Sequence, residues 1–343
     1  MCCMKSEMIA ILKYLLCLVI FISHQNSYSQ NIAVPAEKKP VEKGYIKFDD
    51  TRNTVWPEDF SVVEIISEKD RVVQKSYFYK TKAAERKPLV VSLHTWSGDY
   101  SQKDEVAAIC KAKDLNYIHP DFRGPNVIGS ACCSELALAD IDDAISYAIK
   151  NGNVDTAKIY VIGVSGGGYA TLATFMKSRH RIKKFSAWAS ISDLTAWYHE
   201  STILGNKYAK NIMDCTNSQG ELNEESARKK SPLYMQGPAK NRENASLHIF
   251  AGIYDCIKGS VPITHSINFY NKLLTDLSVS DKSRYVSDAE KLALLESRRP
   301  LGNLGTISGR KICLQKEYGN LKLTIFEGNH EMLTVYAMDE LLN

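Results

Sequence analysis

The chain has 343 residues, 44% of them hydrophobic, which is ample for a large core. Its 43 basic and 39 acidic residues leave a net charge of +4, which indicates no polyanionic partner such as a nucleic acid. The one short basic run, Arg179 to Lys184, has no nucleic-acid-reading motif around it, and we interpret it as a solvated helix end and loop.

The N-terminal segment is typical of an export signal. Lys5 precedes an apolar run from Met8 to Ile22, and Ser27-Tyr28-Ser29 offers small residues before a cleavage site. We therefore expect a signal peptide at 1–29, a polar flexible leader at 30–59 and a folded domain at 60–343, located in the periplasm or outside the cell. The apolar run is short for a membrane span, so we expect no stable span after cleavage; a retained anchor is the alternative.

Six cysteines remain after the expected cleavage, and in an exported domain they allow up to three disulfides. Adjacent cysteines do not bridge each other easily, and the pairing stays open, as does the alternative of buried free thiols. A bridge between Cys256 and Cys215 would brace the neighbouring Asp255. The spacing fits no zinc site, and we expect neither a metal nor an organic cofactor. The six are Cys110, Cys132, Cys133, Cys215, Cys256 and Cys313.

The pattern of elements predicts an α/β fold. Two strand-like runs with a turn between them, 61–66 and 71–79, indicate an antiparallel hairpin. Strands and helices then alternate, which is typical of a mostly parallel central sheet covered by helices on both faces. In such sheets ligands bind beyond the carboxyl ends of the strands. We expect strands at 88–94, 116–119, 155–162, 185–191, 247–251 and 321–326, and helices at 104–112, 135–150 and 169–177.

Two polar stretches interrupt this alternation, at 204–245 and 279–310. Both follow strand ends, so we expect them near the rim of the ligand site. Long insertions in such places commonly act as lids or specificity elements, and plain surface loop is the alternative.

The most informative motif is Gly163-Val164-Ser165-Gly166-Gly167. It lies between an apolar strand and a helix-forming run, so Ser165 falls on a sharp strand-to-helix turn. Glycines on either side permit strained backbone and close packing there. The turn would hold the hydroxyl beside a helix N-terminus, where backbone N–H groups can stabilise an oxyanion. A glycine-rich turn with an incidental serine is the alternative.

A serine becomes a strong nucleophile when a histidine takes its proton and a carboxylate orients that histidine. Asp255 and His330 follow Ser165 in that order, each at the end of a predicted strand. Asp193 and Glu327 are the rival acids, and Asp193 fits better as a helix cap.

The loop His94-Thr95-Trp96-Ser97-Gly98-Asp99 also follows an apolar strand, where a second oxyanion donor is expected. We predict an oxyanion hole made by the backbone N–H groups of Trp96 and Gly166, with Thr95 as the alternative donor. Thr95 and Tyr254 are also candidates for the substrate pocket.

Together, Ser165, Asp255, His330, the His94 loop and the segment Asp121-Phe122-Arg123-Gly124 resemble the α/β-hydrolase fold. Within it the chain is similar, over roughly 60–340, to the catalytic domain of prolyl oligopeptidase-type enzymes and to related secreted carbohydrate esterases. The resemblance implies that Asp121 and Arg123 brace the site, with Arg123 paired to Asp142 or Asp143. The family's His-Gly-Gly loop is here His94-Thr95-Trp96.

The resemblance also implies an N-terminal β-propeller in the peptidases, and the stretch before the first strands leaves no room for one. We therefore expect a secreted serine hydrolase that cleaves a small ester or an acylated carbohydrate through an acyl-enzyme. A serine peptidase with the same residues is the alternative, because both reactions are acyl transfer. A non-catalytic binding protein on a hydrolase fold is the alternative from another class.

Overall fold

A computed structural model describes residues 56–237, 242 and 244–343 of the chain. The expected signal peptide and nearly all of the leader lie outside these residues. Within the described part, no helix has both the length and the apolar character that a membrane span needs.

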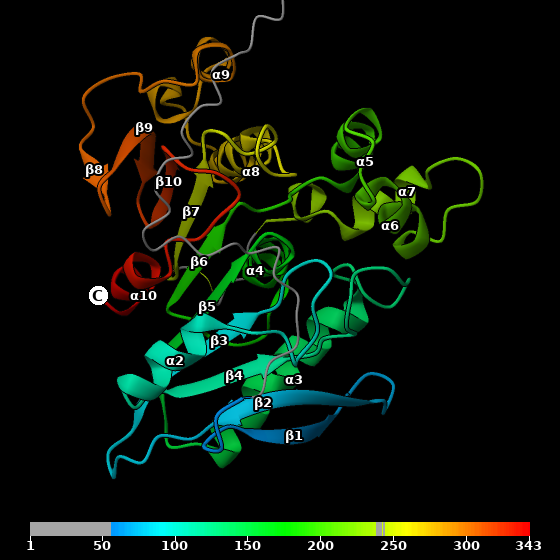
Figure 1. The fold of residues 1–343 in the computed structure, drawn as a ribbon, viewed down its shortest axis with the longest axis vertical. Helices are drawn as coiled ribbons and strands as arrows, with labels where there is room; N and C mark the ends of the chain where they lie inside the picture. The colour runs from blue at the N-terminus through cyan, green and yellow to red at the C-terminus, as the bar shows by residue number, and fades with distance from the viewer. Residues whose placement is uncertain (1–55, 238–241, 243) are drawn as a thin grey trace, which may run out of the picture. The chain divides into compact units, whose positions relative to one another are not determined.

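The fold is built on one ten-stranded sheet with the order β1-β2-β4-β3-β5-β6-β7-β10-β9-β8 (Figure 1). The six central strands, from β4 to β10 in this order, are parallel, and β1–β2 form the antiparallel hairpin predicted from the sequence. This confirms a mostly parallel sheet. The strands are β1 (Ser61–Ile66), β2 (Val73–Tyr79), β3 (Lys87–Leu93), β4 (Asn116–Pro120), β5 (Val154–Val164), β6 (Lys184–Trp188), β7 (Ser246–Gly252), β8 (Thr306–Ile307), β9 (Arg310–Tyr318) and β10 (Leu321–Phe326).

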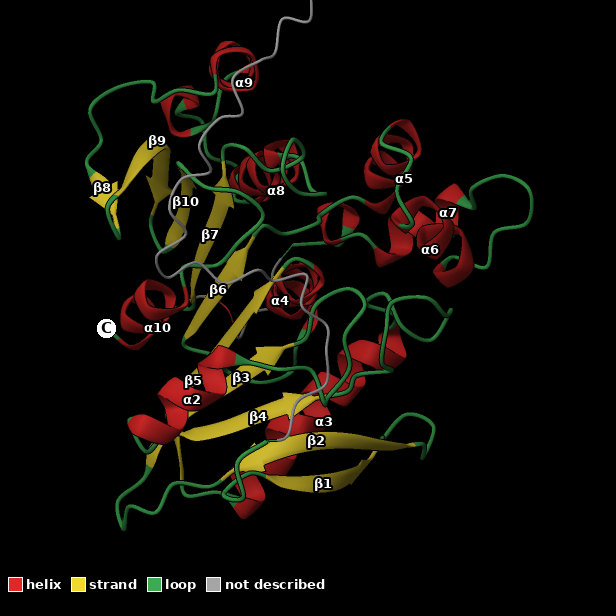
Figure 2. Cartoon of the chain, viewed as in Figure 1, coloured by secondary structure: helices red, strands yellow, loops and turns green. Residues whose placement is uncertain are grey.

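Helices cover both faces of the sheet (Figure 2). Side chains of β3 alternate between two cores, because Leu89 and Val91 pack on one side and Val90 on the other. The first core lies under α3, α4 and α8, and the second under α2 and α10. These helices are α2 (Glu105–Ala112), α3 (Glu135–Asn151), α4 (Gly166–Lys177), α8 (Ile263–Asp276) and α10 (Thr334–Leu342).

The two predicted insertions contain helices. α5 (Leu194–Ile203) leads into the first, which holds α6 (Tyr208–Cys215) and α7 (Glu224–Lys230). The second holds α9 (Asp288–Ser297), which begins with a capping box between Ser287 and Glu290. Strands β8 and β9 were not predicted. Along β9 the side chains from Ile312 to Leu314 are buried and those on either side are polar and partly or fully exposed, so the apolar stretch of this strand is short.

One buried histidine ties stability to pH. His119 of β4 is 1% exposed, and its Nδ1–H donates to the Ser92 carbonyl at 2.8 Å. Burial lowers the pKa of His119 from its usual 6.5 to about 4, despite the nearby Asp104 carboxylate. Between these values the unfolded chain binds a proton that the folded chain does not, so stability falls as pH falls from 6.5 towards 4.

We expect the wild-type chain to lose about 2 kcal/mol of unfolding free energy between pH 7 and pH 5 through His119. Urea unfolding at both pH values, with His119→Gln as the comparison, measures this contribution. The loss should be smaller by that amount in the variant. An equal loss in both proteins would contradict the assignment.

Candidate active site

The turn at Ser165 joins β5 to α4 and has strained backbone. Ser165 has φ 58° and ψ −120°, outside the ordinary regions for a residue with a side chain, and is 4% exposed. Its N–H donates to the Trp188 carbonyl and its carbonyl accepts from Tyr169, both at 2.9 Å. These bonds to β6 and α4 hold a conformation that costs energy, as is common at functional residues.

The glycines of the motif are required by close packing. A Cβ on Gly163 would lie 2.4 Å from the Gly167 carbonyl, and one on Gly167 would lie 2.1 Å from the Leu93 carbonyl. Both contacts are far too short, so glycine alone fits. The end of β3 therefore lies directly against the start of α4.

The acid and the histidine are joined directly. Asp255 follows β7 and His330 follows β10, and these two parallel strands are neighbours. His330 Nδ1 lies 2.7 Å from Asp255 Oδ2, with both side chains buried. The second carboxylate oxygen, Oδ1, accepts the N–H groups of Cys256 at 2.8 Å and Val261 at 3.1 Å. An Nδ1–H that donates to Asp255 leaves Nε2 as the ring atom that can accept a proton.

The turns that carry these two residues are packed together. Tyr254 donates its N–H to the Gly328 carbonyl at 2.9 Å. A Cβ on Gly259 would lie 2.3 Å from Asp255 Oδ1 and 2.4 Å from His330 Cβ. Because β5, β7 and β10 are parallel, Ser165 lies beyond the carboxyl end of its strand, on the same side of the sheet as Asp255 and His330. The rival acid Asp193 caps α5 by accepting from Thr195 and Ala196, as expected from the sequence.

The predicted oxyanion donors lie against each other. A Cβ on Gly166 would be 2.2 Å from the backbone N of Trp96. The alternative donor, the N–H of Thr95, is engaged with Gln102 Oε1 at 3.1 Å, and the Thr95 hydroxyl donates to the same oxygen at 2.9 Å. The geometry therefore favours Trp96 over Thr95.

Replacing Gly166 by alanine is expected to push the Trp96 amide away and lower kcat by about 10²- to 10³-fold, the usual cost of losing one oxyanion donor. Steady-state kinetics of Gly166→Ala measures this. Gly302→Ala is the control, because a Cβ there meets nothing within 4 Å. Unchanged kcat in a folded Gly166→Ala enzyme would place the oxyanion hole elsewhere.

The bracing residues differ from the prediction in one respect. Arg123 binds Asp140 of α3, with Nε 2.5 Å from Oδ2, and Asp70 of the β1–β2 turn, with Nη1 2.8 Å from Oδ2. The expected partners, Asp142 and Asp143, instead bind Arg179, and Asp143 also accepts the N–H of Glu68 in the β1–β2 turn at 2.8 Å. The hydrogen bonds that Arg123 donates to the Asp70 carboxylate are the largest cause of the raised pKa of Arg123. Arg123 thus ties the hairpin to α3.

Asp121 contacts the loop that begins at His94 and carries the predicted oxyanion donor Trp96. Its Oδ1 accepts the N–H of Tyr100 at 3.1 Å, and its backbone carbonyl lies 2.7 Å from His94 Nε2. Burial raises the pKa of the Asp121 carboxyl and lowers that of His94. The His94 ring also stacks on Phe122, with ring centroids 3.8 Å apart.

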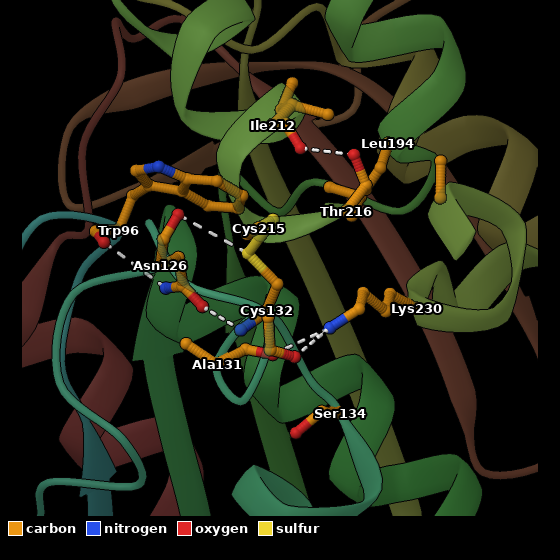
Figure 3. Close-up of a disulfide and its surroundings, with 12 residues drawn as sticks. Trp96, Asn126, Ala131, Cys132, Ser134, Leu194, Ile212, Cys215, Thr216 and Lys230 are labelled. Carbon is orange, nitrogen blue, oxygen red and sulfur yellow. Dashed lines mark hydrogen bonds between the residues drawn. A yellow bond between two sulfur atoms is a disulfide. The ribbon is translucent and has the colours of Figure 1, made fainter. Parts of the chain in front are cut away.

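The expected Cys256–Cys215 bridge is wrong. Cys215 of α6 is bonded to Cys132, which lies in the loop before α3 (Figure 3). The remaining described cysteines, Cys110, Cys133, Cys256 and Cys313, are free thiols. Nor does the described part of the chain bring together three or more His, Cys, Asp or Glu side chains that could hold a metal ion.

Comparisons with known proteins bear on the family and on the fold. Residues 101–288 match the model of the prolyl oligopeptidase family. Acylamino-acid-releasing enzyme 2 of Oryza sativa subsp. japonica is 26% identical over 115 residues, which are 31% of this chain and 15% of the rice protein.

Two solved structures share the fold. Pyrococcus horikoshii acylaminoacyl peptidase has a TM-score of 0.52 at 18% identity, covering 67% of this chain and 36% of its own. A puromycin hydrolase has a TM-score of 0.54 at 13% identity, covering 82% of this chain and 38% of its own. At such identities the likeness confirms the α/β-hydrolase fold. The chain spans less than two fifths of either structure.

Proposed function

Because this chain belongs to the prolyl oligopeptidase family of serine hydrolases, we propose that Ser165, His330 and Asp255 are its catalytic triad. The main support is the 2.7 Å contact between His330 Nδ1 and Asp255 Oδ2. This contact lies at the carboxyl ends of the parallel strands, where the strained turn of Ser165 also lies. A histidine oriented in this way is the base that a serine nucleophile needs.

The reaction follows from the roles of these groups. Ser165 Oγ attacks the carbonyl carbon of the substrate while His330 Nε2 takes the hydroxyl proton. Asp255 stabilises the imidazolium that forms. The N–H groups of Trp96 and Gly166 bind the negative oxygen of the tetrahedral intermediate. His330 then protonates the leaving group, and water attacks the acyl-enzyme by the same steps to restore Ser165.

For the substrate we propose a peptide-type amide, such as a short or N-acylated peptide. The support is the family itself and the names of the compared proteins, an acylamino-acid-releasing enzyme and an acylaminoacyl peptidase. The preference for acylated carbohydrates expected from the sequence stays a prediction, because the triad performs both reactions.

A panel of substrates separates these two proposals. We expect N-acyl-peptide p-nitroanilides to be cleaved, with acetylated xylo-oligosaccharides releasing little acetate. Activated esters such as p-nitrophenyl acetate are unsuitable, because serine peptidases also cleave them. Each activity is compared with that of Ser165→Ala. Acetate release that depends on Ser165, without anilide cleavage, would instead establish a carbohydrate esterase.

We also propose that the protein is exported. The N-terminal sequence supports this, as does the Cys132–Cys215 disulfide, because such bonds persist mainly in oxidising compartments. Cell fractionation followed by N-terminal sequencing tests it. The expected mature protein begins at Gln30 outside the cytoplasm, whereas a cytoplasmic chain with an intact N-terminus would contradict it.

A further inference from the structure

A buried asparagine holds the loop that carries the proposed oxyanion donor. Asn126 is 2% exposed and lies after the Asp121–Gly124 segment. Its backbone N–H donates to the Trp96 carbonyl at 2.9 Å, and its side-chain Nδ2 donates to the same oxygen at 3.3 Å. The Trp96 carbonyl is therefore held by two donors of one residue, of which Figure 3 shows the side-chain Nδ2.

The residue before Trp96 is anchored as well. The Thr95 N–H donates to Gln102 Oε1 at 3.1 Å. The peptide unit that presents the Trp96 N–H thus lies between two fixed points, Gln102 on one side and Asn126 on the other. Releasing either point allows the backbone dihedral angles around Trp96 to change, and with them the direction of its N–H.

Asn126 is in turn held by the disulfide. Its Oδ1 accepts the backbone N–H of Cys132 at 2.8 Å, and Cys132 is bonded to Cys215 at the end of α6. Cys132 also contacts α4, because its carbonyl accepts a hydrogen bond from the hydroxyl of Tyr169 at 2.8 Å. It also has φ 51°, a left-handed backbone that disfavours residues with side chains. The bonds at Cys132 hold that conformation.

A second contact joins the same two regions. The indole ring of Trp96 packs edge-on against Trp197 of α5, with centroids 4.7 Å apart, and Trp197 stacks on Tyr208 of α6 at 4.8 Å. The Trp96 side chain is therefore linked to the first insertion through Trp197 and Tyr208. The Trp96 carbonyl is linked to the disulfide through Asn126.

We propose that Asn126 is a positioning residue for the oxyanion hole and that the Cys132–Cys215 disulfide fixes Asn126, which couples the first insertion to catalysis. This rests on the proposed function, in which the Trp96 N–H binds the oxyanion. Asn126 itself does not touch the substrate. It acts through the Trp96 peptide, and it matters more in the transition state than in substrate binding.

The test compares kcat, KM and the inhibition constant of a peptidyl trifluoromethyl ketone, which forms a tetrahedral adduct with a serine. We expect Asn126→Ala to lower kcat by about 10- to 100-fold and to raise the inhibition constant of the ketone by a similar factor. KM should stay within about 2-fold of the wild-type value. A loss confined to the tetrahedral state identifies positioning of the oxyanion donor, which a merely structural role would not produce.

The disulfide arm is the double replacement Cys132→Ala/Cys215→Ala, alone and together with Asn126→Ala. If the disulfide acts through Asn126, the triple variant loses no more kcat than the more damaging of its two parts, the double cysteine replacement or Asn126→Ala. Effects within one linked network are not additive. Fully multiplied losses would mean that the disulfide and Asn126 act separately, which overturns the coupling.

Asn116→Ala is the matched control. Asn116 is also a buried asparagine; its Nδ2 donates to the Lys87 and Asn153 carbonyls, and its Oδ1 accepts from Thr81. It lies at the amino end of β4, whereas Ser165 lies beyond the carboxyl end of β5. Its loss should therefore lower the melting temperature and leave kcat and ketone affinity unchanged.

The outcomes distinguish this proposal from the proposed function. A wild-type protein without Ser165-dependent turnover refutes the proposed function. An active wild type whose folded Asn126→Ala variant keeps its kcat and its ketone affinity refutes the positioning role alone. If Asn126→Ala does not fold, Asn126→Asp carries the same test, because it keeps the Oδ1 acceptor for Cys132 and removes the Nδ2 donor to Trp96.

Discussion

Ser165→Ala is expected to lower kcat by about 10⁴-fold or more, because no other group in the proposed mechanism can form the acyl-enzyme. KM should change little, since the hydroxyl contributes mainly to the chemical step. Kinetics on the best substrate of the panel measures both values. The remaining activity should come from the oxyanion hole and substrate binding alone.

Ser190→Ala is the control for this replacement. Ser190 is buried beside α4, where its Oγ would lie 2.5 Å from a Cβ on Gly168, so it tests the same region without touching the nucleophile. Its kcat should stay within a few-fold of the wild type. If Ser165→Ala retained wild-type turnover, another nucleophile would be required.

Asp255→Asn is expected to lower kcat by about 10⁴-fold, because the amide can turn an N–H towards His330 Nδ1 and hold the ring in the wrong tautomer. The shape of the site stays the same, so the variant should fold normally and bind substrate with a similar KM. Kinetics together with thermal unfolding separates loss of catalysis from loss of structure.

Asp193→Asn is the matched comparison, because Asp193 is the rival acid from the sequence. It caps α5 and accepts the hydroxyl of Tyr234 at 2.8 Å, so its replacement should lower stability and leave kcat nearly unchanged. A larger loss of kcat in Asp193→Asn than in Asp255→Asn would reverse the assignment of the acid.

The parts of the fold that the sequence predicts are those with strong local signals. The apolar runs of β3 and β10 lie where their periodicity places them, because buried parallel strands are almost continuously hydrophobic. The order of Ser165, Asp255 and His330 at strand ends predicts the contact of the last two, because parallel strands bring their carboxyl ends to one edge.

The wrong or missing predictions concern long-range pairing of side chains. Asp140, Asp142 and Asp143 all lie on α3, and only its rotation in the fold turns Asp140 towards Arg123. Partners of cysteines are decided in the same way, so Cys132–Cys215 could not be read from spacing.

The role proposed for Asn126 has no local signal at all. An asparagine after a proline is typical of any turn, and its importance comes from contacts with Trp96 and Cys132 that the tertiary fold creates. Strand β9 is a milder case, because its short buried stretch is too brief to separate from a loop.

Labelling with a fluorophosphonate tests the central claim most directly, because this reagent bonds to a serine only when a base activates it. We expect one adduct per folded chain, located by peptide mass spectrometry at Ser165, and abolished in His330→Ala as well as in Ser165→Ala. The absence of any adduct in the folded wild-type chain, or an adduct at a different residue, would contradict the proposed triad and favour a non-catalytic binding protein on this fold.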